Sequence, residues 1–211
     1  MFVILRTQSM SRISLVRSFS NLLILAGFLA LSAVGFVWAQ ARVFQRDASQ
    51  RFDLAAARSS SEVTAPARIS AAGTSQTASV GSVVGKLEIP RIGVSAIVLE
   101  GADAATLRKA VGHIPGTAMP DQPGNVALAG HRDTFFRALR NIRKDDLITF
   151  KTLSGPHNYR VEYFEVVKPE DVGVLKNTGR PTLTLVTCYP FYFIGSAPKR
   201  FIVRADEIPA G

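Results

Sequence analysis

Residues 182–203 read TLTLVTCYPFYFIGSAPKRFIV and contain the only cysteine of this 211-residue chain. The first run, residues 182–188, is rich in β-branched side chains, which favours a strand. Successive side chains of a strand point to opposite faces, so Leu183 and Leu185 share one face and Cys188 lies on the other. If the leucines fill the core, the thiol stands at the end of the strand and points away from that core.

A second β-like run, residues 199–204, follows shortly after the cysteine. Phe201 and Val203 share one face of this run, and Arg200 takes the opposite face. If the two strands are neighbours, Cys188 and Arg200 both point away from the core. A thiol and a guanidinium placed in this way predict a functional site.

A lone cysteine in a strand is more often a small buried hydrophobe than a nucleophile. A reactive Cys188 therefore needs a partner that favours its thiolate. The sequence offers three histidines. His113 lies in a loop rich in Gly and Pro, and His157 follows a turn, so both are interpreted as structural. His131 ends a predicted strand and is the candidate partner.

The predicted strand 125–131 has the same alternation as the other two. Leu128 has the parity of the core, and His131 has the opposite parity. Ala127 and Ala129 share the face of the histidine, and their small side chains would leave room for a bound chain. The phase of all three strands therefore turns His131, Cys188 and Arg200 to the outside.

Charge and cysteine content exclude several classes of protein. The formal net charge is +9, of which residues 1–80 carry +5 and residues 81–211 carry +4. The basic residues of the second part are interspersed with acidic ones, so no block of the kind that follows a nucleic-acid backbone is present. One cysteine excludes an internal disulfide and a multi-cysteine metal site.

Residues 22–39, LLILAGFLALSAVGFVWA, are eighteen positions without a charge. As a helix they would extend about 27 Å, close to the hydrocarbon thickness of a bilayer. We interpret them as an uncleaved signal-anchor, although the small residues at 39–41 leave signal-peptide cleavage open. Three arginines precede the segment, which predicts a cytoplasmic N-terminus and a single-pass protein of the cytoplasmic membrane with its bulk on the outer side.

Three parts of the chain are expected: residues 1–41 as the cytoplasmic tail and membrane anchor, 42–81 as a flexible linker, and 82–211 as a folded domain. Residues 55–81 are dominated by Ala, Ser, Thr and Gly, and after Arg58 the composition is too poor in large apolar residues for a core. The first part of the linker, residues 41–57, has a composition that also allows a helix.

The folded domain is predicted to be all-β, with about eight short strands and few helices, forming a closed barrel or a sandwich. Asp103 and Asp133 are expected to cap two short helices. The predicted strands are 85–90, 94–99, 125–131, 146–151, 158–168, 182–188 and 199–204; the predicted helices are 103–111 and 133–142, and residues 112–124 are expected to be loop.

The sequence TLVTCYPF at 184–191, followed by GSAPKR at 195–200 and preceded by AGHRDTFF at 129–136, resembles the sortase transpeptidases of bacterial surfaces. The similarity extends over roughly residues 83–207 and is greatest to the class D sortases. It implies an eight-stranded β-barrel behind an N-terminal membrane anchor. The combination of motifs is specific, whereas a Thr-x-x-Thr-Cys fragment alone would not be.

The resemblance implies that Cys188 is the nucleophile, His131 the general acid and base, and Arg200 the group that stabilises the substrate carbonyl oxygen. These residue types suit the roles, because a thiolate can form a thioester, an imidazole can move a proton, and an arginine keeps its charge. The backbone N–H of Tyr189 is a candidate second donor to that oxygen. The substrate-binding residues are not identified.

The implied function is cleavage of a C-terminal sorting signal of the Leu-Pro-x-Thr-Gly or -Ala kind after Thr. The acyl group would then pass to an amine, such as that of a cell-wall peptide or a pilin lysine. Two alternatives stay open: a hydrolytic cysteine peptidase with the same site, and a membrane-tethered binding module with Cys188 in its core. Glu170 and Asp171 are too few for a calcium site, so neither a metal nor another cofactor is expected.

Overall fold

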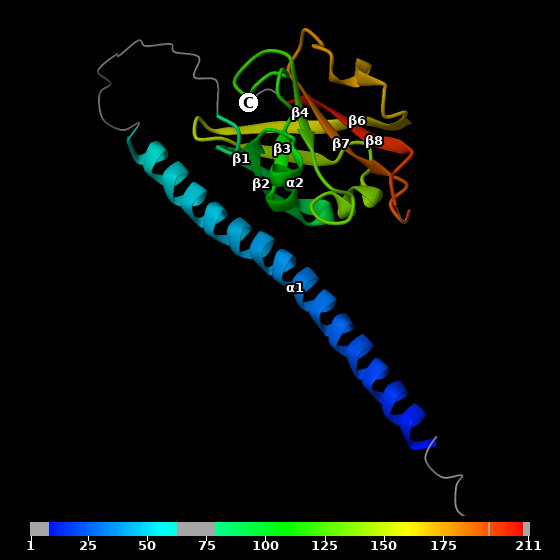
Figure 1. Cartoon of the computed structure of the whole chain (residues 1–211). Helices are drawn as coiled ribbons and strands as arrows, with labels where there is room; N and C mark the ends of the chain where they lie inside the picture. Colours follow the sequence, from blue (N-terminus) through cyan, green and yellow to red (C-terminus); the bar gives the residue numbers. More distant parts are fainter. Residues whose placement is uncertain (1–8, 63–78, 194, 209–211) are drawn as a thin grey trace, which may run out of the picture. The chain divides into compact units, whose positions relative to one another are not determined.

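The computed structural model describes residues 9–62, 79–193 and 195–208. Eight strands close into one barrel in the order β1-β2-β3-β4-β7-β8-β6-β5 (Figure 1). The all-β class and the eight-stranded barrel predicted from the sequence are confirmed. The strands are β1 (Val83–Ile89), β2 (Val94–Glu100), β3 (Val111–His113), β4 (Asn125–Ala129), β5 (Leu147–Lys151), β6 (Pro156–Val167), β7 (Thr182–Tyr189) and β8 (Lys199–Glu207).

The pairing of the strands brings three distant segments together. Strands β4 and β7 are parallel neighbours, and β7 and β8 are antiparallel neighbours. The pair β2–β3 is also parallel, and every other pair of the barrel is antiparallel. The strands that carry or precede the predicted site residues are therefore adjacent.

The interior of the barrel is filled by the bulky residues whose alternation predicted it. Leu183 and Leu185 of β7 are fully buried, and so is Leu128 of β4. Phe201 and Val203 of β8 belong to the same core cluster. Burial of such side chains contributes about 1.5–3 kcal/mol each, so this pattern fixes which face of each strand turns outward.

Strand β6 shows why its alternation is imperfect. Val161 pairs with Ala205, whereas Tyr163 pairs with Arg204, so Glu162 is an extra residue in the ladder. A bulge of this kind shifts the parity of the strand by one. Tyr159 and Val161 before the bulge are buried, whereas residues 162–166 after it are exposed.

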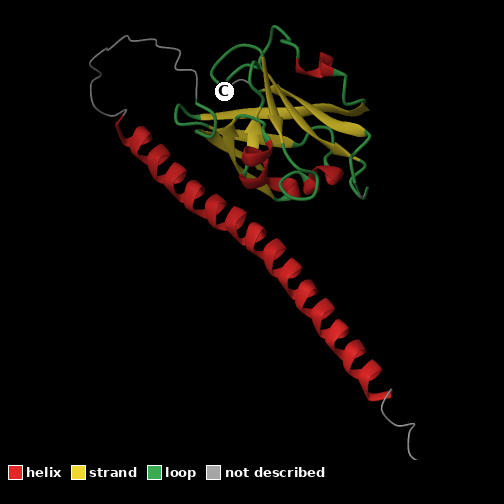
Figure 2. Cartoon of the chain, in the orientation of Figure 1, coloured by secondary structure: helices red, strands yellow, loops and turns green. Residues whose placement is uncertain are grey.

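The helices are short apart from the first (Figure 2). Asp103 caps α2 (Ala104–Lys109), as expected, by accepting hydrogen bonds from the backbone N–H groups of Ala105 and Thr106. The prediction of a capped helix over 133–142 is wrong, because that region holds only the 3-10 helix η2 (Arg137–Asn141), whose N-cap is Phe136. The predicted loop 112–124 begins with part of β3. The other 3-10 helices are η1 (Pro90–Ile92) and η3 (Val172–Leu175).

The chain divides into two compact units, residues 1–42 and 43–211. Helix α1 (Ser9–Glu62) provides the described part of the first unit. Its apolar stretch is exposed throughout and is long and apolar enough to cross a membrane. By this criterion of length and composition, the described residues contain one candidate membrane span.

The second unit includes the end of α1 together with the barrel. Phe52 and Ala48 are buried in a small apolar cluster with Ile97 and Leu99 of β2. The linker predicted over residues 42–81 is thus helical as far as Glu62, and part of it packs on the barrel. The rest of that predicted linker, residues 63–78, lies outside the described residues.

Candidate active site

Cys188 and Arg200 form a cross-strand pair. The register of β7 and β8 places Cys188 directly opposite Arg200. Directly opposed residues of an antiparallel pair share one face, with Cβ atoms about 4.5–5.5 Å apart. Both side chains are half-buried, and Cys188 is a free thiol. The prediction that these two residues lie side by side, outside the core, agrees with this geometry.

His131 lies just past the end of β4, the parallel neighbour of β7. The last pair of this ladder is Ala129 with Val186, so the strand predicted to end at His131 ends two residues earlier, at Ala129, and Cys188 lies two residues past Val186. The backbone N–H of Gly130 donates to the carbonyl of Val186 at 3.1 Å. The hydroxyl of Thr187 donates to the carbonyl of Gly130 at 2.7 Å. These bonds extend the contact between the chains to the residue just before the histidine.

Cys188 and Arg200 therefore lie on adjacent strands, and His131 follows the end of β4, the strand on the other side of β7. Neighbouring strands lie about 4.8 Å apart, which is the spacing between the backbones of β7 and β8 at Cys188 and Arg200. His131 is exposed, which leaves its imidazole accessible to a ligand.

The guanidinium of Arg200 is oriented by the loop that precedes it. Its Nη1 donates to the carbonyl of Ala197 at 3.2 Å and to that of Lys199 at 3.0 Å. The loop therefore restrains Arg200 on the side of the strand shared with Cys188. The proposed role of the Tyr189 N–H as a second donor stays a prediction.

The expectation of open space over both alanines of β4 is wrong for Ala127. Ala127 is fully buried, and its backbone N–H donates to the hydroxyl of Thr117 at 3.2 Å. The loop after β3 thus covers this position. Ala129 is only half-buried, so the small side chain next to the histidine is the one that contributes to an open surface.

The connection between β6 and β7 covers the remaining outward residues of β7. Asn125 donates from Nδ2 to the carbonyls of Val174 and Lys176. It also accepts a hydrogen bond from the hydroxyl of Thr184 at 2.6 Å. Since Thr184 is fully buried and Cys188 is not, this face of β7 becomes accessible toward its cysteine end.

The other two histidines have structural contacts. His113 is buried and lies 2.7 Å from Glu100 through Nδ1 and 3.0 Å from the carbonyl of Ala118 through Nε2. His157 lies between the carboxylates of Glu207 and Asp121, at 3.0 and 2.9 Å. Both therefore tie parts of the barrel together, whereas His131 is exposed.

Sequence reasoning assigned no role to Arg132. The residue is 7% exposed and donates to three carbonyls of the β7–β8 loop. The sequence did contain a signal for this role. Arg132 directly follows His131 and has the parity of the core residues, and an arginine that is buried must find hydrogen-bond partners. Asp133, by contrast, is exposed, and its Oδ1 lies 3.6 Å from Nε of Arg132.

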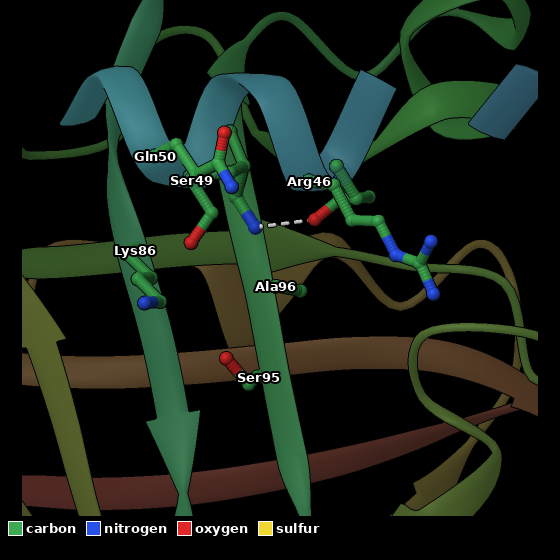
Figure 3. A pocket seen from close by; sticks show the side chains of 8 residues that line it. Arg46, Ser49, Gln50, Lys86, Ser95 and Ala96 are labelled. Atoms are coloured by element: carbon green, nitrogen blue, oxygen red, sulfur yellow. Dashed lines mark hydrogen bonds between the residues drawn. The ribbon is translucent and has the colours of Figure 1, made fainter. Parts of the chain in front are cut away.

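A hollow of about 340 Å³ lies elsewhere, between α1 and strands β1 and β2 (Figure 3). None of the three predicted site residues lines it. Gln45 of α1 closes one side by accepting the N–H of Ile97 and donating to the carbonyl of Lys109, both at 2.8 Å. We interpret the hollow as a by-product of this helix packing on the barrel.

The set of His131, Cys188 and Arg200 is suited to cysteine-based acyl transfer. A thiolate can attack a carbonyl, a neighbouring imidazole can move the proton, and a fixed cation can stabilise the developing oxyanion. Similarity to other proteins places the chain more narrowly. The profile of the sortase domain matches residues 87–208, so the chain belongs to the sortase family.

The relatives agree with the class D resemblance expected from the sequence. Sortase D of Bacillus subtilis is 36% identical over 129 residues, covering 61% of this chain and 65% of that protein, which is less than two thirds of its length. The crystal structure of sortase C-1 from Actinomyces oris is similar with 33% identity and a TM-score of 0.57, covering 61% of this chain and 75% of that one. Sortase C of Clostridium perfringens, solved with the C-terminal cell wall sorting motif, has 27% identity and a TM-score of 0.58, covering 64% and 75%.

Proposed function

We propose that this protein is a membrane-anchored cysteine transpeptidase that cleaves a C-terminal sorting signal of the Leu-Pro-x-Thr-Gly or -Ala kind after Thr. It transfers the threonyl acyl group to an amine. The observation that carries the proposal is the pairing of Cys188 with Arg200 on β7 and β8, with His131 two residues past the end of β4, the other neighbour of β7. Membership of the sortase family and the similarity to a sortase solved with a sorting motif support it.

The proposed reaction begins at Cys188. Its thiolate attacks the threonine carbonyl carbon, and the carbonyl electrons move to the oxygen, where the Arg200 guanidinium stabilises the negative charge. The intermediate then collapses to a thioester, and the departing amine takes a proton from His131. In the second half an incoming amine gives a proton to His131 and attacks the thioester, which releases Cys188.

The surroundings of these three residues suit an extended peptide. Ala129 beside His131 is small, and Val186 shares the outward face of β7 with Cys188; both are half-buried. A chain lying over these residues brings a carbonyl to the thiol between the two flanking side chains. The substrates are surface proteins that carry such signals, and the acceptor is an amine, for example that of a cell-wall peptide or a pilin lysine.

The membrane placement is part of the same proposal. The apolar segment of α1 spans the cytoplasmic membrane once, with its N-terminus inside and the barrel outside. Support comes from the uninterrupted apolar stretch and from the arginines that precede it. Tethering of the enzyme would keep it near newly exported substrates.

The test uses the full chain in detergent micelles and a quenched fluorescent peptide that contains Leu-Pro-x-Thr-Gly or Leu-Pro-x-Thr-Ala. Products are identified by mass spectrometry with and without a small primary amine. The expected result is a Thr–amine conjugate that disappears in Cys188→Ala. Release of free threonine carboxylate at every amine concentration would instead identify a hydrolytic peptidase. Product formation by Cys188→Ala would overturn the mechanism.

A further inference from the structure

Arg132 is a buried cation held by neutral groups. Its Nη1 donates to the carbonyl of Pro190 at 3.0 Å, and its Nη2 donates to those of Phe193 at 2.6 Å and Gly195 at 3.1 Å. Its Nε is buried without a hydrogen-bond partner. The charge lies 3.6 Å from Asp133, a residue largely exposed to solvent. Such a buried charge is a costly way to stabilise a fold, because an apolar side chain of similar size often serves better.

The three acceptors all belong to one loop, residues 190–198, which joins β7 to β8. This loop follows Cys188 by two residues and precedes Arg200 by two. One planar guanidinium binds three carbonyls of it at fixed angles, which a single ammonium group cannot reproduce. The guanidinium carbon also lies 6.0 Å from the centre of the Phe193 ring. Arg132 thus defines the path of the loop over several residues.

The position of Arg132 in the chain links this loop to the histidine. His131 is exposed, but the residues on both sides of it are buried and bonded to β7 or its loop. Gly130 exchanges hydrogen bonds with Val186 and Thr187, and Arg132 binds the loop. The backbone of His131 is consequently fixed at two points relative to Cys188.

The same loop orients the arginine on the other side of the thiol. Arg200 donates to the carbonyls of Ala197 and Lys199, so its guanidinium is placed by the backbone that follows the part held by Arg132. A change in the loop would therefore move the Arg200 guanidinium. The contacts lead from Arg132 through the loop to Arg200.

We propose that Arg132 is a positioning residue, which fixes the described residues of loop 190–198 and thereby sets His131 and Arg200 in their places relative to Cys188. The assignment rests on the proposed function for its catalytic consequence. Its physical reason is that acyl transfer needs the reacting groups aligned closely, and a displacement of about 1 Å can cost a hundredfold in rate. Arg132 itself faces the loop carbonyls and needs no contact with the substrate.

The experiment compares three substitutions in the full chain in detergent micelles. Arg132→Met removes every donor and keeps the apolar volume, and Arg132→Lys keeps the charge but loses the planar fork. Arg160→Met is the matched control, because Arg160 is an exposed arginine opposite Asp206, far along β8 from Arg200. Each variant is measured for kcat and KM of amine transfer, for its thermal midpoint, and for amide hydrogen exchange of loop 190–198.

For Arg132→Met we expect exchange of the loop amides to rise at least tenfold and kcat to fall about 10- to 100-fold. KM should change less than kcat, and the thermal midpoint should stay near that of the unchanged protein. The loop exchange and kcat of Arg132→Lys should lie between those of Arg132→Met and those of the unchanged protein. Arg160→Met should match the unchanged protein in both measurements. If Arg132→Met does not fold, the lysine variant carries the same comparison.

Two results would overturn the assignment: loop exchange unchanged in both Arg132 variants, or kcat reduced only in proportion to the folded fraction. The exchange measurement needs no substrate. If the unchanged protein transfers no acyl group to any amine, the proposed function fails, whereas the exchange data still show whether Arg132 holds the loop.

Discussion

Cys188 and Arg200 lie directly opposite each other on β7 and β8. The pair is separated in sequence by a loop and in space by one strand spacing. This relationship gives the two side chains one shared outward face. The proposed division of labour between nucleophile and charge stabiliser follows from this placement.

Replacement of Arg200 should lower catalysis more than it lowers binding. Arg200→Ala removes the donors proposed for the oxyanion, and loss of one such group typically costs 10²- to 10³-fold in kcat. Arg200→Lys should recover only part of the rate, because an ammonium lacks the fork geometry. Steady-state kinetics with the fluorescent peptide measure both. Lys199→Ala, next to it and exposed, serves as control, and an Arg200→Ala enzyme of normal kcat would contradict the role.

The histidines should separate function from stability. His131→Gln should reduce kcat about 10²- to 10⁴-fold through loss of proton transfer, while its exposed position should keep the thermal midpoint nearly unchanged. His113→Gln should lose about 1–3 kcal/mol of unfolding free energy, because it disturbs buried bonds to Glu100 and Ala118.

Chemical denaturation and peptide kinetics on both variants check this contrast. The activity of His113→Gln per folded molecule should stay close to that of the unchanged protein. If His131→Gln instead unfolded readily and kept its turnover, the assignment of the acid and base would have to move to another residue.

Much of the site could be predicted from alternation alone. The parity of Leu183, Leu185 and Val203 against Cys188 and Arg200 indicated the outward face, because a one-residue shift would bury the wrong side chains. Pairing between β4 and β7 is a long-range contact between parallel strands, and sequence pattern carries no direct signal for it. The adjacency of His131 to Cys188 could therefore be expected only through the family resemblance.

Short elements and covering loops were beyond the sequence pattern. Strand β3 has three residues, one of them Gly112, which is too few to show a period. Ala127 looked open because its side chain is small, but burial depends on the distant loop that carries Thr117. The helix expected from Asp133 is replaced by turns followed by the 3-10 helix η2.

Gly130 should tolerate no side chain. A Cβ at this position would lie 2.7–2.9 Å from ring atoms of Phe136, which is fully buried. Gly130→Ala should therefore cost about 1–3 kcal/mol through overpacking, and it should displace His131 and lower kcat. Phe136→Leu removes part of the ring and makes room. A double-mutant cycle by denaturation should give a favourable coupling of at least 0.5 kcal/mol; strictly additive effects would show that the clash is relieved elsewhere.

Ionisation of Asp146 should make part of the unfolding free energy depend on pH in the acidic range. Its carboxylate is buried, binds the guanidinium of Arg91, and accepts the backbone N–H of Arg143 at 2.8 Å. The pKa of Asp146 is lowered, and the largest cause is the hydrogen bond from Arg91. The hydrogen bond from the backbone N–H of Arg143 also lowers this pKa, whereas burial of the carboxyl raises it. The unfolded value is about 3.9, so the ionised form is favoured by folding.

The sign of the effect follows from linkage. The pKa of Asp146 is lower in the folded than in the unfolded protein, so its ionised carboxylate contributes its full stabilisation at pH values above about 4. This contribution is lost as the pH falls toward the folded pKa. Asp146→Asn should lower the unfolding free energy by about 1–3 kcal/mol near pH 7. The difference from the unchanged protein should stay constant down to about pH 5 and shrink below pH 4. Urea titrations across this pH range measure the difference.

Asp145→Asn is the control, because Asp145 is exposed and adjacent and asparagine accepts its positive φ of 68°. A difference that persisted undiminished at pH 3 would exclude ionisation of Asp146 as its cause.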